Sequence, residues 1–186
     1  MARSLLDTAD LAHLRRLAGS GPAQALAACV VDSGLLQFDP DDPTWEDRDR
    51  LVLAGDGLST AIGTRIAAAG GGPRTTLHAT HGGDALAMAF GAAAASELDG
   101  GGWRSWCGLD EEACDDGRIW EVARAAAAAR LPTLGAFVAG VATAPLWRAC
   151  GWQVHLAPAD DPAWLLGAFD LSMAVAPGVV MVAAGD

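Results

Sequence analysis

The sequence predicts an α/β protein whose mainly parallel sheet is covered by helices on both faces. Short apolar segments alternate with helical segments through the second half of the chain, a pattern typical of parallel sheets. The 186 residues suit a single globular domain, 1–186, because a chain of this length can bury a full core. Hydrophobic residues make up 52% of the chain and charged residues 19%, so we expect a folded protein.

Periodicity and breakers define the elements of the first half. Apolar residues recur at a helical spacing from Leu5 to Leu17, and Gly19-Ser20-Gly21-Pro22 ends that helix. Pro22 suits the first turn of a second helix that runs to about Leu36. The segments that follow are predicted to be a buried strand at 51–53, a helix at 58–69 and an extended crossing at 75–80.

The second half repeats strand and helix. A helix at 119–130 can be capped by Asp115 or Asp116, and Pro132 forbids its continuation. The other predicted elements are helices at 85–98, 145–149 and 160–168, and strands at 103–107, 134–138, 153–156 and 179–183. Ligands of parallel sheets bind beyond the carboxyl ends of the strands. The candidate site therefore lies in the loops at Gly55, His81, Gly108 and Ala139.

Composition and charge exclude several classes of protein. A net charge of −11 argues against a nucleic-acid surface, which needs clustered cations. The longest apolar stretch, Ala85 to Ser96, is too short to span a bilayer, and the N-terminus lacks a signal-peptide core, so we expect no membrane contact and a cytoplasmic location. The four cysteines have no C-x-x-C spacing, which predicts buried, reduced thiols.

Two short motifs resemble metal sites. Asp56 in Gly55-Asp56-Gly57 could hold a metal ion, but such triplets are common turns and no second ligand is near, so the sequence favours a turn. His78 and His81 are three residues apart on a predicted strand and loop, without a third ligand in register. Tetrahedral zinc needs more convergent groups, so two unrelated histidines are favoured, although His81 could still contact an anion.

The segment His81-Gly82-Gly83-Asp84 precedes a predicted helix and has the form of a phosphate-binding turn. Free backbone N–H groups and the positive end of the helix would both favour an anion there. Asp84 supports a second interpretation, because its carboxylate can cap the same N–H groups. The sequence favours the cap over the phosphate site.

An acidic loop, predicted at 108–117, follows a predicted strand. Its carboxylates are hard oxygen ligands of the kind that Mg²⁺ prefers. They belong to Asp110, Glu111, Glu112, Asp115 and Asp116. A solvated loop that caps the next helix predicts the same residues, so both interpretations stay open.

Four segments, in order, resemble the transketolase family. They are LLQFDPDDPTWEDRDRLVLA, HGGDALAMAFGAAAA, EEACDDGRIWEVARAAAAARLPTLGAFV and LWRACGWQVHLAPADDPAWLLGAF. The first is similar to the family's D-P-x-W-x-D-R-D-R loop and strand, and the second to its glycine loop near the cofactor diphosphate. The match covers nearly the whole chain and corresponds to the amino-terminal, diphosphate-binding half of the family.

The resemblance implies a three-layer α/β/α thiamine-diphosphate fold and a site formed between chains. It implies thiamine diphosphate and Mg²⁺ as cofactors, with the cofactor against His81, Gly82, Gly83, Asp84 and Gly108. It also implies a separate partner chain, similar to the carboxy-terminal half of transketolase, in a hetero-oligomer. The implied chemistry is transfer of a two-carbon ketol unit by the two chains together, and this chain alone would be inactive.

The sequence departs from the family at the residues that carry chemistry. Two family histidines are replaced, at Gly21 and Gly57, so no catalytic residue is predicted. The metal-binding G-D-G becomes Asp110-Glu111-Glu112, which leaves Asp110 or Glu111 as the metal-binding carboxylate. The family's D-x-N falls at Ala139-Gly140-Val141, which offers no side-chain oxygen.

Three functions follow from these observations. The first is an enzyme subunit that transfers ketol units with its partner chain. The second is a catalytically degenerate, cofactor-free subunit that stabilises or regulates such an enzyme. The third is a fold reused for another small ligand, because fold does not fix function.

Overall fold

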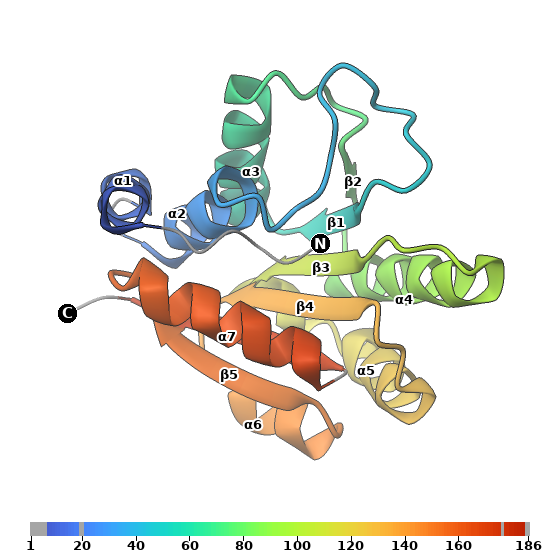
Figure 1. Cartoon of the computed structure of the whole chain (residues 1–186). Helices are drawn as coiled ribbons and strands as arrows, with labels where there is room; N and C mark the ends of the chain where they lie inside the picture. Colours follow the sequence, from blue (N-terminus) through green and yellow to red (C-terminus); the bar gives the residue numbers. More distant parts are fainter. Residues whose placement is uncertain (1–6, 19–20, 176, 185–186) are drawn as a thin grey trace.

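The computed structural model describes residues 7–18, 21–175 and 177–184. A single sheet of six parallel strands runs through the centre of the protein, in the order β2-β1-β3-β4-β6-β5 (Figure 1). The strands are β1 (Arg50–Ala54), β2 (Thr76–His78), β3 (Ser105–Asp110), β4 (Leu134–Ala139), β5 (Gln153–Pro158) and β6 (Gly178–Ala183). The predicted α/β class with a parallel sheet is confirmed.

Helices cover both faces of this sheet because successive residues of each strand point to opposite sides. Leu51 and Leu53 of β1 pack into one core, and Val52 and Ala54 into the other. The first core also receives α1 (Thr8–Ala18), α2 (Pro22–Ala27), α3 (Asp56–Ala68) and α7 (Pro162–Ala174). The second receives α4 (Gly82–Asp99), α5 (Arg118–Ala129) and α6 (Ala144–Ala149). The result is a three-layer α/β/α arrangement.

Aromatic rings anchor α7 to the first face. The ring centroid of Phe169 on α7 lies 5.8 Å from that of Trp106 on β3 and 5.9 Å from that of Phe137 on β4. Glycines give these rings room: a Cβ at Gly108 would lie 2.5 Å from the Phe137 ring, and a Cβ at Gly135 would lie 2.4 Å from the Trp106 ring. Such close packing explains two glycines inside central strands.

Three tryptophans and a stripe of alanines form the second face. The ring centroids of Trp120 and Trp147 lie 5.5 Å apart, and those of Trp147 and Trp152 lie 4.9 Å apart. The Trp152 indole N–H donates to the Ala123 carbonyl at 2.9 Å, which ties the start of β5 to α5. The buried alanines of α4, at 85, 89 and 93, allow that helix to approach the sheet closely.

Several predicted boundaries differ from the structure. The second helix becomes a π-helix at Ala28–Asp32 and ends there, whereas we expected it to reach about Leu36. Strand β3 extends to Asp110 because it pairs along its full length with β4, a tertiary contact that local sequence does not encode. Glycines at the start of α4 are helical, and the expected acidic loop contains a 3₁₀ helix, η2 (Glu111–Asp115). Part of the predicted Gly19–Pro22 breaker lies outside the described residues.

Two further observations concern the surface. No helix in the described part of the chain has the length and apolar character that a membrane span requires. Glu121 and Arg124, which the sequence places one turn apart on α5, form no ion pair among the described residues.

The order of the strands places a switch point between β1 and β3. From β1 the chain passes through α3 to β2 on one side, and from β2 it passes through α4 to β3 on the other side of β1. In sheets of this kind a crevice opens beyond the carboxyl ends of the strands at the switch point. The loop after β1 and the acidic segment after β3 face each other there.

Candidate functional site

A cavity of about 590 Å³ lies at this switch point. Its lining comes from Gly55–Gly57 at the start of α3, the end of β2 at His78, and the acidic segment at Asp110 and Glu112. The structure therefore brings together two predicted regions, the Gly-Asp-Gly triplet and the acidic loop. Three neighbouring loops meet the acidic segment, and each contact involves one of its carboxylates.

The Asp110 carboxylate is bound to the first turn of α3. It accepts hydrogen bonds from the Gly57 N–H at 2.8 Å and from the Leu58 N–H at 2.9 Å. A Cβ at Gly55, whose φ is +106°, would lie 2.4 Å from an Asp110 carboxylate oxygen. Gly55 is the N-cap residue of α3, and Asp56 and Gly57 are the first residues of that helix, so the triplet is a junction between strand and helix and not the separate turn that the sequence favoured. Its glycines make room for the Asp110 side chain.

The Glu111 carboxylate is bound to the turn between β4 and α6. It accepts a hydrogen bond from the Ala142 N–H. A Cβ at Gly140, whose φ is +151°, would lie 2.4 Å from the carboxyl carbon of Glu111. The turn 139–141, which offers no side-chain oxygen, thus faces a carboxylate of the protein itself.

The glycine loop at the start of α4 is covered by the acidic segment. A Cβ at Gly82 would lie 2.1 Å from the Ala113 carbonyl oxygen, so backbone packs directly against this glycine. The Gly83 N–H donates to the Asp116 carboxylate at 3.1 Å. Both glycines are buried. The acidic segment therefore packs against the loop for which the resemblance implies a cofactor diphosphate.

Asp84 does not cap its own helix, contrary to the favoured interpretation of the sequence. Its carboxylate pairs with the Arg118 guanidinium at 3.2 Å, and Arg118 also binds Asp116 at 3.1 Å. The residue that reaches the N-terminus of α4 is Asp116, 33 residues away from Gly83. From the sequence, Asp116 was expected either to cap the helix at 119–130 or to belong to a group of Mg²⁺ ligands, and no local signal marks its contact with α4.

The remaining predicted residues are placed as follows. His81 is the exposed N-cap residue of α4 and makes no side-chain capping bond. His78 Nε2 lies 3.0 Å from the Thr76 hydroxyl, and Gly21 is the N-cap residue of α2. Gly108 lies inside β3 and is buried against Phe137, whereas we predicted that it begins a loop. The cofactor and metal roles of these residues stay predictions.

Comparisons with known proteins give the fold a name. No protein-family model and no curated protein sequence matches the chain. Solved structures do match it. The chain has a transketolase-like fold. It superposes on transketolase from Leishmania mexicana with a TM-score of 0.73 at 16% identity, over 95% of this chain and 36% of that one. For transketolase from Campylobacter jejuni the TM-score is 0.74 at 17% identity, over 95% of this chain and 38% of that one.

A third match is the Pichia stipitis transketolase in complex with sedoheptulose-7-phosphate. Its TM-score is 0.73 at 18% identity, over 95% of this chain and 36% of that one. The transketolase-like chain therefore spans little more than a third of the length of these proteins. At such low identity the similarity establishes the fold alone.

The residues of the transketolase-like chain do not fit a magnesium-bound diphosphate in this arrangement. Mg²⁺ requires near-octahedral oxygen ligands. The Asp110 and Glu111 carboxylates are turned to backbone N–H groups, and the turn at 139–141 supplies no side-chain oxygen. Within the described ranges, no group of three or more His, Cys, Asp or Glu residues could hold a metal ion.

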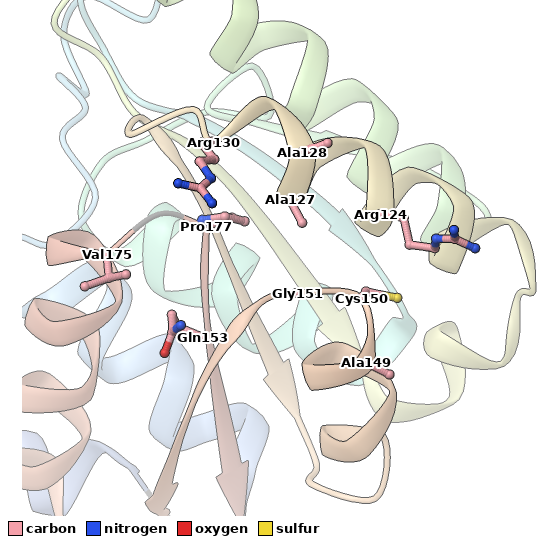
Figure 2. Close-up of a pocket in the computed structure, with 10 residues that line it drawn as sticks. All are labelled: Arg124, Ala127, Ala128, Arg130, Ala149, Cys150, Gly151, Gln153, Val175 and Pro177. Atoms are coloured by element: carbon pink, nitrogen blue, oxygen red, sulfur yellow. The ribbon is translucent and has the colours of Figure 1, made fainter.

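A second cavity, of about 560 Å³, lies away from the switch point, near the start of β5 (Figure 2). Arg124 and Arg130 line it, and Cys150, Gly151 and Gln153 form part of its wall. Figure 2 shows the two guanidinium groups near opposite ends, pointing away from each other. They do not converge on one point, so the cavity lacks the geometry of a single anion site.

Proposed function

We propose that this chain is a cofactor-free subunit with a transketolase-like fold, which assembles with a second chain and stabilises or regulates it. The second chain would resemble the remaining, carboxy-terminal part of transketolase. The share of the matched proteins that this chain spans, 36–38%, supports a domain that works with another chain. The proposal assigns no catalytic residue to this chain.

The contacts of Asp110 carry the proposal. Asp110 is the carboxylate best placed to hold Mg²⁺ at the switch point, yet both of its oxygens accept N–H groups of α3 at 2.8 and 2.9 Å. Release of this carboxylate to a metal would leave the first turn of α3 without its cap, which costs about 1 kcal/mol. Metal binding would therefore compete with a contact that holds β3 to α3.

Charge supports the same conclusion. The formal net charge is −11, and the cavity at the switch point contains the carboxylates of Asp56, Asp110 and Glu112. A diphosphate placed there would face negative charge with no histidine at Gly57 and no metal to offset it. We expect the protein to reject an anionic cofactor at this site.

The competing proposal is a subunit that binds thiamine diphosphate and transfers a two-carbon ketol unit with its partner chain. The transketolase-like fold and the length of the chain favour it. It requires Asp110 and Glu111 to leave their backbone partners. It also requires the chemistry to proceed without two family histidines, whose places are taken by Gly21 and Gly57.

A titration separates the two proposals. Two samples are titrated with thiamine diphosphate at saturating Mg²⁺: the purified chain alone, and the chain mixed with a transketolase carboxy-terminal-half chain encoded in the same genome. The heat of binding and the midpoint of thermal unfolding are recorded for each sample. A cofactor-free subunit forms a complex in which this chain supplies no cofactor contact. Replacing Asp110 and Glu111 by alanine then leaves the ketol-transfer activity of the complex unchanged at a temperature where the variant is folded. Cofactor binding that disappears in the double variant would overturn the proposal.

A further inference from the structure

Strand β5 ends the sheet on one side, with α7 on one of its faces and α6 on the other (Figure 1). It pairs with β6 alone, so one row of its backbone groups has no strand partner among the described residues. The Gln153 N–H points toward β6, since it donates to the Pro177 carbonyl at 3.1 Å. Successive residues of a parallel strand direct their N–H and C=O groups to opposite sides, so those of Val154 and Leu156 point outward. Such an open row is a template for a further strand.

Large apolar side chains gather around this open edge. The described residues expose nine large hydrophobic side chains, and five of these lie within 144–175: Leu146, Leu156, Trp164, Leu171 and Val175. Trp164 and Leu171 of α7 are 62% and 60% exposed, and they line a cavity of about 640 Å³ together with residues 154–156 of β5. The cavity joins the helix and the strand into one surface, which we call the β5 face and define by residues 154–156, Trp164 and Leu171.

Helix α7 is apolar around its whole circumference. Asp170 is the only charged residue among its 13 residues. One side of the helix buries Leu165 and Phe169 in the core, and another exposes Trp164 and Leu171. Helices that are hydrophobic on all sides are typically buried on all sides. The exposed side of α7 therefore has the composition of an interface rather than of a solvated surface.

Charge indicates what kind of molecule covers the β5 face. The three elements that form this side of the protein, α6, β5 and α7, contain one arginine and one aspartate, so their formal charges cancel. The chain as a whole carries −11, so its copies repel each other in general. A face without net charge minimises that repulsion, whereas a basic partner would gain more from the acidic surface elsewhere. The β5 face is therefore suited to a partner that is itself acidic.

We propose that the β5 face binds a second copy of this chain around a two-fold axis perpendicular to the sheet. The rotation places β5 antiparallel to β5 of the other copy, α7 beside α7 and α6 beside α6, as an isologous contact requires. The outward backbone groups of Val154 and Leu156 then pair, and two six-stranded sheets become one. A single operation thus supplies a strand for the open edge and an apolar helix for α7. The opposite edge strand, β2, has only three residues, so the assembly stops at a dimer.

The size of the face agrees with a weak dimer. The 13 residues of α7 and the six of β5 each span about 20 Å, so strand and helix match their copies in length. Three layers are about 25 Å thick, which gives a flat face of about 500 Å² per copy and about 1,000 Å² for the pair. Specific interfaces of this size lie at the lower end of the range, so we expect a dissociation constant in the micromolar range.

The inference goes beyond the proposed function and does not depend on it. The cavity at the switch point lies between β1 and β3, and β4 and β6 separate β3 from β5. A dimer formed through β5 therefore leaves the switch point free for a different chain. Two copies of this chain and two copies of the other chain would form one assembly.

Sedimentation equilibrium of the purified chain tests the inference. We expect the mass to rise from one chain, 18.9 kDa, toward two chains between loading concentrations of about 5 and about 500 μM. Hydrogen exchange examines the edge itself. The Val154 and Leu156 amides should exchange at least about threefold more slowly at the higher concentration, because only the monomer leaves them open. The outward amide of His78 on β2 is the control and should not change.

Two substitutions should weaken the contact without adding negative charge. Leu156→Arg and Leu171→Arg each place a cation in the apolar face, and each should raise the dissociation constant at least about tenfold. Leu98→Arg is the matched control, because Leu98 is 87% exposed near the end of α4 and the change in charge is the same. All three variants make the chain equally less negative, so general repulsion cannot explain a difference between them.

A chain that stays monomeric at about 500 μM would overturn the inference. So would a dimer that Leu98→Arg weakens as much as Leu171→Arg, or one in which the Val154 and Leu156 amides keep their exchange rates. If the chain alone is monomeric and Leu171→Arg prevents its complex with the carboxy-terminal-half chain, that chain covers the β5 face. The inference then fails while the proposed function stands. A dimer that forms no complex with the other chain has the reverse meaning.

Discussion

The Asp110 carboxylate accepts the Gly57 N–H at 2.8 Å, across 53 residues of sequence. This bond and its neighbour to Leu58, at 2.9 Å, join the end of β3 to the start of α3 at the switch point of the sheet. The Gly-Asp-Gly triplet at 55–57 therefore has a structural explanation, because its first glycine leaves room for the carboxylate. The contact also yields the first prediction.

Asp110→Ala should lower the free energy of unfolding by about 1–2 kcal/mol, because two N–H groups in the first turn of α3 lose their acceptor. Urea denaturation at neutral pH measures the change. Glu112→Ala is the control: Glu112 is an exposed carboxylate in the same cavity and accepts no hydrogen bond from the described residues. A loss of similar size in both variants would contradict the capping role of Asp110.

Asp49 should make stability depend on pH in an unusual direction. Burial raises the pKa of Asp49, and bonds from the Arg104 N–H at 2.8 Å and the Gln37 N–H at 3.1 Å only partly oppose that shift. A raised folded-state pKa gives a stabilising contribution that is complete below the unfolded value, about 3.9, and is lost as pH rises through the folded value.

The free energy of unfolding of the wild type minus that of Asp49→Asn should therefore decrease as pH rises from below about 4 toward neutrality. Urea denaturation at a series of pH values measures this difference. For Asp47→Asn, an exposed change in the same loop, the free energy of unfolding of the wild type minus that of the variant should stay nearly constant with pH. A difference that grows with pH would show that the hydrogen bonds to Asp49 lower its pKa more than its burial raises it.

Gly108→Ala should destabilise the protein by about 1–3 kcal/mol, because the new methyl group would overlap buried side chains. A Cβ there would lie 2.5 Å from the Phe137 ring and 2.6 Å from Leu53. Gly91→Ala is the matched control at an exposed position of α4, where a Cβ meets nothing within 4 Å, and it should stabilise the helix by up to about 1 kcal/mol. Thermal denaturation that ranks the two variants in the opposite order would contradict the packing of β3.

The thiols should differ sharply in reactivity. Cys29, Cys107 and Cys114 are buried, and burial raises the pKa of Cys114 to about 12, so little thiolate forms at pH 8. Cys150 is partly exposed, although burial also raises its pKa. We expect Ellman's reagent to modify only Cys150 in the native protein and all four thiols in guanidinium chloride. Rapid modification of a Cys150→Ser variant under native conditions would contradict the burial of the other three.

Local sequence predicted the order and type of most elements because periodicity, glycine and proline act within a few residues. The strand at 51–53 and the helix at 119–130 agree closely with β1 and α5. The segment DPTWEDRDR resembles a loop of the transketolase family. In the structure, two of its polar residues contact neighbouring segments. Asp49 joins the loop to the start of β3, and the Arg50 guanidinium lies 4.8 Å from the centroid of the Trp103 ring.

The sequence by itself determined a parallel α/β sheet and an acidic segment after the third strand. Only the tertiary structure decided what that segment does. The pairs Asp110 with Gly57 and Asp116 with Gly83 are 53 and 33 residues apart. Such pairs form because parallel strands bring their carboxyl ends to one edge, and a carboxylate there can bind a metal or a neighbouring N–H group with the same oxygens. Spacing along the chain cannot distinguish these outcomes, whereas the geometry of the donors can.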